Sequence, residues 1–200
     1  EEVNLPFWCQ TRLDTFTEEK INMLKEMGCQ AMSLGMEHGD EKVRNDLIKK
    51  GISDEQIIEA AHLIAKSGIT ATINSMIGLP DETREQVFKT IDMNKKLYAI
   101  LGGKCSLNTF TFSPFYGTSL REISIKKGYL KDPKKVPNFY SESVLEMPSM
   151  SREEILGFEK TLPLYTKLPE EYFPQIEIAK KDDDEGRDMF EKLSEISKNF

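Results

Sequence analysis

The sequence has few cysteines, and none of them belongs to a recognisable metal or disulfide motif. Its 200 residues contain three, which are Cys9, Cys29 and Cys105. They form neither a CxxC nor a CxxxCxxC spacing, which excludes a disulfide framework and a thiolate metal motif within the sequence. An odd, scattered set is typical of a reducing compartment, so we expect a cytoplasmic protein with its cysteines in the core.

The sequence also lacks long apolar runs and an excess of positive charge. No apolar run approaches the ~20 residues of a membrane span, so no membrane partner is expected. The 34 acidic residues outnumber the 27 basic ones and give a formal net charge of −7. This argues against a nucleic-acid partner, because general nucleic-acid binders need a basic surface. The 38% hydrophobic and 30% charged content is ordinary for a soluble globular domain.

Strand-like and helix-like segments alternate through the first two thirds of the chain. Uncharged or β-branched runs predict strands at Leu5–Arg12, Cys29–Gly35, Ile69–Ile77 and Ser106–Ser113. Capping residues followed by amphipathic segments predict helices that begin near Thr17, Ser53, Thr83 and Thr118, with a further short helix over Asp40–Lys49. The predicted fold class is therefore α/β, with about four parallel βα units. An open doubly wound sheet and part of a TIM-like barrel both fit this pattern.

After about residue 130 the alternation stops. Residues 131–150 contain prolines and little periodicity, which is typical of a long connection. Ser151 and Glu154 predict the start of a helix over Arg152–Tyr165, and a charged break precedes a last amphipathic helix. We therefore divide the chain into a βα portion, residues 1–130, and a C-terminal extension of loop and helices, residues 131–200.

The loops after the strands are where parallel α/β folds place their binding sites. Glu37 follows the second strand between two glycines, where a carboxylate could bind an ammonium group or ribose hydroxyls. An ordinary turn, with Asp40 as a helix N-cap, is the alternative. His38 is an unlikely metal ligand, since no partner lies at metal-ligand spacing, and we predict no metal-binding residue.

Three other loops could contribute to a site. Gly78 would let a flat ring approach the backbone, or simply form a tight turn. Phe112 and Pro114 could wall an adenine pocket, or only pack the rim of the fold. Arg12 could bind a carboxylate, or pair with the nearby Asp14.

The order of these loops resembles one known family. The matching segments are TRLD at 11–14, MSLGMEHGD at 32–40, KGI at 50–52, MIGLPDET at 76–83 and FSPFYGTSL at 112–120. They are similar to loops of the radical S-adenosylmethionine (SAM) enzymes, especially the branch that often carries an N-terminal cobalamin-binding domain. The resemblance covers roughly residues 5–128. It implies a partial TIM-like barrel with SAM across the carboxyl ends of its strands.

The resemblance also implies roles for individual residues. Arg12 and Glu37 would help hold the amino-acid part of SAM, and His38 would lie near its ribose. The residues expected to contact adenine are Asn74, Gly78, Phe112 and Pro114. Glu82 would order its turn rather than touch ligand, and no residue is assigned a catalytic role. His38 departs from the family, which usually has serine there, as do Asp81 in place of glycine and Asn74 in place of a small residue.

In this family SAM is cleaved by one electron from a [4Fe–4S] cluster, giving a 5′-deoxyadenosyl radical, or a methyl group is transferred with cobalamin. The cluster needs a CxxxCxxC motif, which this sequence lacks. We therefore expect a cysteine-bearing unit upstream of Glu1, with cobalamin allowed through an upstream domain. The 200 residues alone are expected to be inactive and to self-associate through the edge of the Leu5–Arg12 strand. The alternative is a non-catalytic α/β domain that keeps the loops for binding or assembly.

Overall fold

The structure is a computed structural model that describes residues 5–132, 134 and 145–200. The connection predicted over residues 131–150 therefore lies largely outside the described residues. The described chain divides into two compact units, residues 1–75 with 92–108 and residues 76–91 with 109–200. Each unit is described by itself below. The division of the chain near residue 130 stays a prediction.

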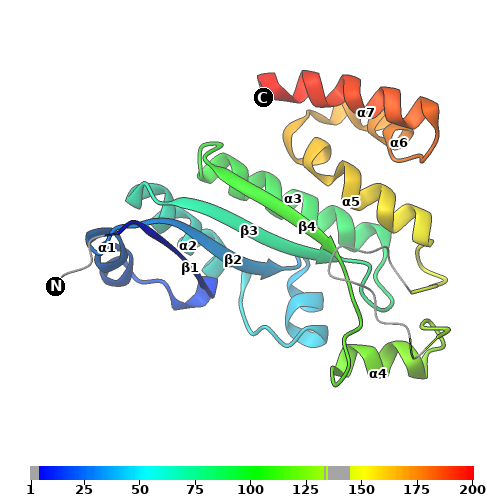
Figure 1. Ribbon diagram of the computed structural model, residues 1–200, viewed down its shortest axis with the longest axis horizontal. Coiled ribbons are helices and arrows are strands. Elements are labelled where there is room, and N and C mark those ends of the chain that lie inside the picture. The colour runs from blue at the N-terminus through cyan, green and yellow to red at the C-terminus, as the bar shows by residue number, and fades with distance from the viewer. Residues whose placement is uncertain (1–4, 133, 135–144) are drawn as a thin grey trace. The chain divides into compact units, whose positions relative to one another are not determined.

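A single sheet confirms the predicted α/β class (Figure 1). Its four strands, in spatial order, are β1 (Phe7–Thr11), β2 (Cys29–Glu37), β3 (Thr70–Ile77) and β4 (Cys105–Thr111). The pairs β1–β2 and β2–β3 are parallel. Parallel neighbours need a crossover between them, and the helices expected from the sequence supply these crossovers.

The helices that follow the strands are α1 (Glu18–Glu26), α2 (Asp54–Ser67), α3 (Arg84–Ile100) and α4 (Ser119–Lys126). The predicted capping box of α2 is present, because Ser53 and Gln56 each accept a backbone N–H of the other. The Thr17 and Thr118 side chains cap α1 and α4. The helix predicted over Asp40–Lys49 is shorter and wider than expected, since its regular part is the π-helical turn η2 (Val43–Leu47).

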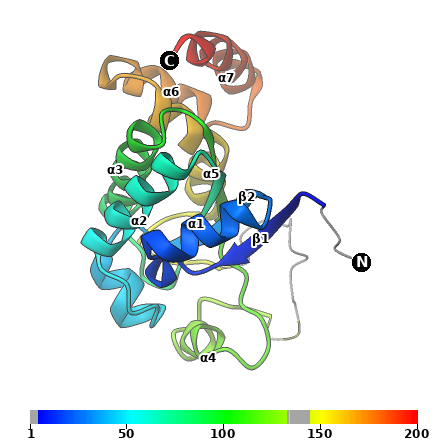
Figure 2. The ribbon, with the colours of Figure 1, turned by 90° about the vertical axis from the view of Figure 1, so that its left-hand side faces the viewer.

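In the first unit the helices cover one face of the sheet (Figure 2). Alternate residues of β2, including Met32, Leu34 and Met36, are fully buried and pack in one core with Ile57 and Ile64 of α2. This burial is the main stabilising term, at about 25 cal/mol per Å² of apolar surface. Met27, the residue after the end of α1, is 64% exposed.

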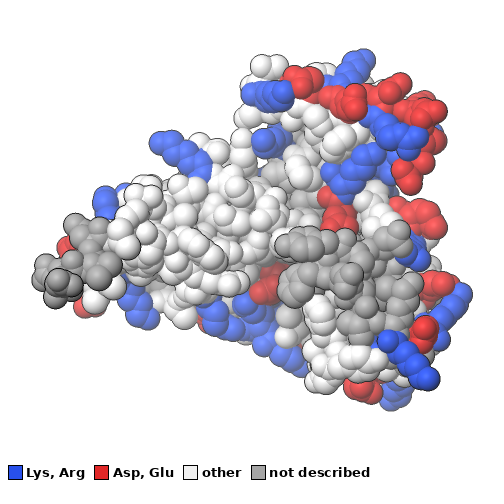
Figure 3. Space-filling view, viewed as in Figure 1, with Lys and Arg blue, Asp and Glu red and all other residues white. Residues whose placement is uncertain are grey.

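The other face of the sheet carries the intervening residues, which are half-buried or exposed. Apart from Trp8 of β1, these residues of the first unit are small or polar, and they include Gln10, Ser33, Thr72, Asn74 and Asn108. The view in Figure 3 shows few charged side chains over the strands. In a (βα) barrel the helices cover the outer face of the sheet, as the helices of the first unit cover the apolar face here.

The second unit contains the helices of the C-terminal extension, which are α5 (Arg152–Lys167), α6 (Phe173–Ala179) and α7 (Asp184–Ile196). The sequence predicts α5 and α7, and it misses α6, which is short and lies in a proline-containing segment. Phe88, Phe158, Tyr165 and Phe173 form a cluster of edge-on and tilted rings that joins α3, α5 and α6. Among the described residues, none of the helices is long and apolar enough to cross a bilayer.

Candidate functional site

Glu37, the last residue of β2, has a positive φ of 71°. Its carboxylate turns back along the strand and accepts a hydrogen bond from Lys50 Nζ at 2.7 Å. A Cβ at Gly35 would collide with this carboxylate and crowd the Lys50 ammonium. Gly35 is therefore needed for the side chain to fold into this position, which gives the G-x-E spacing a physical reason.

Arg12 lies just after β1 and pairs with Asp14. This pairing is one of the two alternatives that the sequence left open. Its Nε and Nη2 atoms donate to the two Asp14 carboxylate oxygens at 3.0 and 2.9 Å. This bidentate pairing raises the pKa of Arg12 and lowers the pKa of Asp14. Nη2 also donates to the Lys50 carbonyl at 2.8 Å, and 48% of the Arg12 side chain stays exposed.

Lys50 connects the two pairs, since its carbonyl contacts Arg12 and its ammonium contacts Glu37. We call Arg12, Asp14, Glu37 and Lys50 the charged cluster. It holds two cations and two carboxylates, brought together from the ends of β1 and β2 and from the loop before α2. A ligand with both an ammonium and a carboxylate group would find a complementary charge for each. The sequence pointed to Arg12 and Glu37 but assigned no role to Lys50.

His38 is completely buried, and its ring orders the loop after Glu37. Nδ1 accepts the Asp40 backbone N–H at 2.9 Å, so the neutral ring carries its proton on Nε2. The Asp40 carboxylate accepts the Val43 N–H at 3.1 Å, as predicted for an N-cap. A place for His38 beside a ribose stays a prediction.

Arg44, to which the sequence assigned no role, stabilises this loop through hydrogen bonds. Its guanidinium is fully buried and donates to the carbonyls of His38 at 2.7 Å and Ile52 at 2.8 Å. It also pairs with Asp54 at 2.5 Å. An arginine among other charged residues of a short helix gives no sequence signal of burial, because such residues usually face solvent.

Asn74 lies in β3 opposite Gly35 of β2, on the polar face of the sheet. Its Nδ2 donates to Ser33 Oγ at 2.9 Å, and its Oδ1 accepts from Asn108 Nδ2 at 3.4 Å. The side chain therefore belongs to a row of hydrogen bonds across three strands. Its contact with adenine is not tested by this geometry.

In the second unit, Gly78 begins the turn after β3 with a φ of +78°. Its N–H donates to the buried carboxylate of Glu82, which also accepts the Leu79 N–H at 3.1 Å. A Cβ on Gly78 would lie 3.0 Å from a methyl group of Ile155. Glu82 thus orders the turn, and the close packing explains why glycine stands here.

Phe112 and Pro114 follow β4, and both are buried. The Phe112 N–H donates to the Ile77 carbonyl at 2.7 Å, which extends the pairing of β3 and β4. The Pro114 carbonyl accepts from the buried Arg121 guanidinium at 2.6 Å. Arg121 also stacks on Tyr116, 3.9 Å from its ring centre. The more exposed aromatic side chains of this rim are Phe115 and Tyr116.

The three cysteines do not form a cluster site in the described part of the chain. Cys9 and Cys29 lie together, with their sulfur atoms 3.9 Å apart. No group of three or more His, Cys, Asp or Glu side chains among the described residues could hold a metal ion. The residues present therefore do not fit a [4Fe–4S] cluster, which needs three thiolates.

Comparisons with known proteins agree with this fold. Residues 2–93 match the family model of the Radical SAM superfamily. An uncharacterized methyltransferase of Pyrococcus horikoshii is 34% identical over 131 residues, or 65% of this chain and 27% of the relative. Cytidylyl-2-hydroxyethylphosphonate methyltransferase of Streptomyces wedmorensis is 24% identical over 160 residues, or 75% of this chain and 29% of the relative.

A solved structure shows the same arrangement. Coproporphyrinogen III oxidase of Escherichia coli, a radical SAM enzyme, superposes with a TM-score of 0.56 at 15% sequence identity, covering 81% of this chain and 32% of the oxidase. At this identity the match concerns the fold. The chain spans about a quarter to a third of the length of these proteins. The matched family model over residues 2–93, the related sequences and the shared fold all point to the radical SAM superfamily.

Proposed function

We propose that this chain forms part of the SAM-binding surface of an enzyme that cleaves SAM reductively, either for radical chemistry or for methyl transfer. The charged cluster is the observation that carries the proposal. It presents a carboxylate and a guanidinium at the carboxyl ends of adjacent parallel strands, where ligands of such folds bind. The amino-acid part of SAM carries the two complementary charges.

In this proposal Glu37 receives the ammonium group of SAM in exchange for Lys50. The exchange is feasible because the Glu37 and Lys50 side chains are 25% and 15% exposed, so the pair is reachable. The half-exposed Arg12 binds the carboxylate with the part of its guanidinium that faces solvent. His38 positions the loop that carries Glu37 and lies toward the ribose. Asn74, Gly78, Phe112 and Pro114 are proposed to line the adenine side.

Two relatives named as methyltransferases favour methyl transfer over other radical SAM reactions. We infer that cobalamin could serve such a reaction from a domain outside these residues. The [4Fe–4S] cluster would likewise have to be held by cysteines outside this sequence. The three cysteines within the sequence do not fit such a cluster. We therefore assign no electron-transfer step to these residues, and propose that they are inactive alone.

A second candidate function is a non-catalytic binding or assembly domain in the cytoplasm. It is favoured by the lack of a CxxxCxxC motif and by β1, which pairs only with β2 among the described strands. In this case the charged cluster would only brace the loops. The two functions differ in whether SAM is consumed.

The intact gene product, purified without oxygen and supplied with iron and sulfide, distinguishes these functions. We expect SAM to be converted to 5′-deoxyadenosine or to a methylated product. Glu37→Gln should weaken SAM binding at least about tenfold, because a charge-assisted hydrogen bond is lost. Glu55→Gln, an exposed carboxylate at the start of α2, is the matched control. Absence of SAM binding and turnover would leave the assembly function.

A further inference from the structure

Cys9 and Cys29 form a thiol pair across the two strands at one end of the sheet. Cys9 lies in β1 and Cys29 begins β2, which pairs with β1 in parallel. Cys29 lies opposite Phe7, two residues before Cys9, so both cysteines point to the same face of the sheet. Their sulfur atoms are 3.9 Å apart. A disulfide bond of about 2.0 Å therefore requires the two sulfur atoms to move closer by roughly 1.9 Å.

The two thiols differ in access. Cys29 is 5% exposed, and its Sγ donates to the Ala31 carbonyl at 3.4 Å. Cys9 is half-buried and lines a hollow of about 350 Å³ between β1 and α1. The apolar walls of this hollow include Phe16, Met23 and Leu24. A small reagent can therefore reach Cys9, while Cys29 can be reached only through Cys9.

The strand that carries Cys9 lies at the edge of the described sheet. Among the described strands, β1 is bonded to β2 alone, and its pairing register already shifts between Phe7 and Trp8. An edge strand is bonded on one side, so fewer hydrogen bonds oppose a shift of β1 than of an inner strand. Cys105 lies on β4 and is the third cysteine of the chain.

We propose that Cys9 and Cys29 are an oxidation site that forms an intramolecular disulfide with a low-molecular-weight disulfide as the oxidant. The Cys9 thiolate attacks one sulfur of oxidised glutathione and releases one glutathione thiolate. The Cys29 thiolate then attacks the Cys9 sulfur of the mixed disulfide and expels the second glutathione. Two protein thiols are oxidised, one glutathione disulfide is reduced, and the two protons pass to solvent.

The environment of the Cys9 thiol affects the rate of this reaction. Burial, and secondarily the neighbouring Cys29 thiol, raises the pKa of Cys9. The reactive thiolate is therefore scarce at neutral pH, and exchange is slow. Once formed, the bond would tie β1 to β2 just before Arg12, and so fix the strand that leads into the charged cluster.

Intact-mass measurement and peptide mapping after incubation with oxidised glutathione test the proposal. We expect a loss of about 2 Da, a peptide that links Cys9 to Cys29, and a Cys105 that stays unoxidised. Cys29→Ser should stop at the glutathione adduct on Cys9, because the second thiol is missing. Cys105→Ser is the matched control and should still form the link.

Other outcomes would overturn the proposal. They are three thiols that stay unmodified at alkaline pH, a link that involves Cys105, or dimers joined through Cys9. Because the mapping is done on the unaltered protein, the result stands even where a cysteine variant fails to fold. Circular dichroism of each variant separates loss of folding from loss of the link.

Discussion

At the scale of single residues, buried charged side chains order the loops after the strands. Arg44 and Glu82 are 0% and 2% exposed, and each satisfies backbone groups of a turn rather than a ligand. Such groups are stabilising only while their partners are intact, because removing one partner leaves the other buried and unpaired. They position the loops that the proposed site uses.

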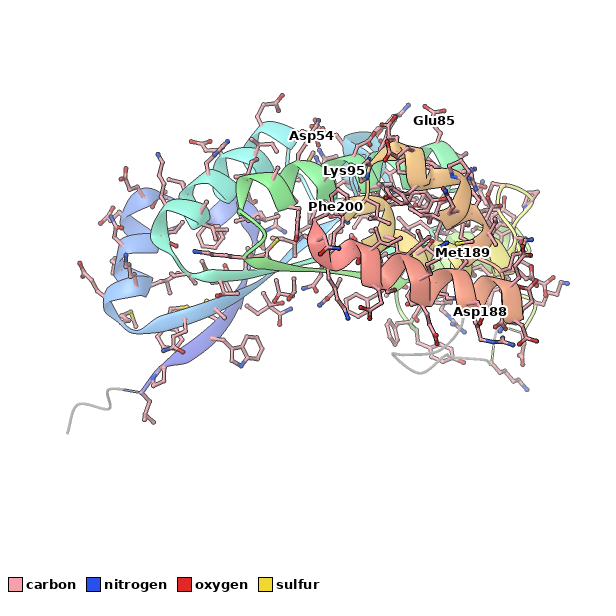
Figure 4. The ribbon with its side chains drawn as sticks, turned by 90° about the horizontal axis from the view of Figure 1, so that it is seen from above. Asp54, Glu85, Lys95, Asp188, Met189 and Phe200 are labelled. Carbon is pink, nitrogen blue, oxygen red and sulfur yellow. The ribbon has the colours of Figure 1, made fainter. Side chains whose placement is uncertain are left out.

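Glu82→Gln should destabilise the protein by about 2 kcal/mol, because the amide is a weaker acceptor for the Gly78 and Leu79 N–H groups. Urea unfolding measures the change. Glu85→Gln is the matched control, since Glu85 lies three residues further on at the exposed surface of α3 (Figure 4). Equal stabilities of the two variants would contradict the role of Glu82.

Arg44→Met should cost about 3 kcal/mol, because methionine fills the space but removes the guanidinium that donates to the His38 and Ile52 carbonyls and to Asp54. The exposed Arg187, replaced in the same way, should cost far less. Thermal unfolding compares the two variants. A similar loss in both would show that the buried guanidinium does not stabilise the loop.

At the scale of elements, the sequence predicts the helix caps but not the packing of short helices. The caps of α1, α2 and α5 follow from side chains within one turn of the helix start, so the local sequence contains them. By contrast, α6 is stabilised by distant contacts, such as Phe173 against Tyr165 of α5. No window of sequence shows such a contact.

Side chains in the turn after β3 and just after the end of α4 interact, and this interaction should make the stability of the protein depend on pH. The Asp81 carboxylate accepts from the Lys127 ammonium and from the Tyr129 hydroxyl at 2.5 Å. Lys127 first, and then Tyr129, lowers the pKa of Asp81. The stabilisation is therefore complete above the ordinary carboxyl pKa near pH 4 and is lost as the pH falls below it.

Asp81→Asn should lower the unfolding temperature by about 2 °C at pH 7, a small effect because the pair is half-exposed. The difference from the unaltered protein should shrink as the pH falls below about 4. Asp188→Asn, an exposed residue of α7 (Figure 4), is the control and should change little at either pH. A difference for Asp81→Asn that grows on acidification would contradict the assignment.

At the scale of the whole molecule, the outer edge of β1 is a surface that favours association. In the described part of the chain β1 pairs with one strand, so the backbone groups of its other edge lack a neighbouring strand. Leu5, Trp8, Met23 and Met27 on or near this edge are 68, 66, 53 and 64% exposed. We therefore expect self-association through the outer edge of β1.

Light scattering of the 200-residue protein should show a molar mass that rises with concentration. Trp8→Lys should suppress the rise, since a lysine on an edge strand opposes pairing with another strand. Phe200→Lys replaces a comparably exposed aromatic residue away from β1 and should leave association unchanged. A monomer at all concentrations would refute this prediction.

The sequence by itself determined the alternation of strands and helices, the helix caps and the loops after the strands, because periodicity and capping act over a few residues. It also determined that no CxxxCxxC motif is present. Only the tertiary structure decided that Arg12 pairs with Asp14, that Lys50 joins Glu37, and that Cys9 meets Cys29. The last two pairs join residues far apart along the chain. For Arg12, the local sequence allowed either binding of a ligand carboxylate or pairing with Asp14. The folded loop shows the pairing with Asp14.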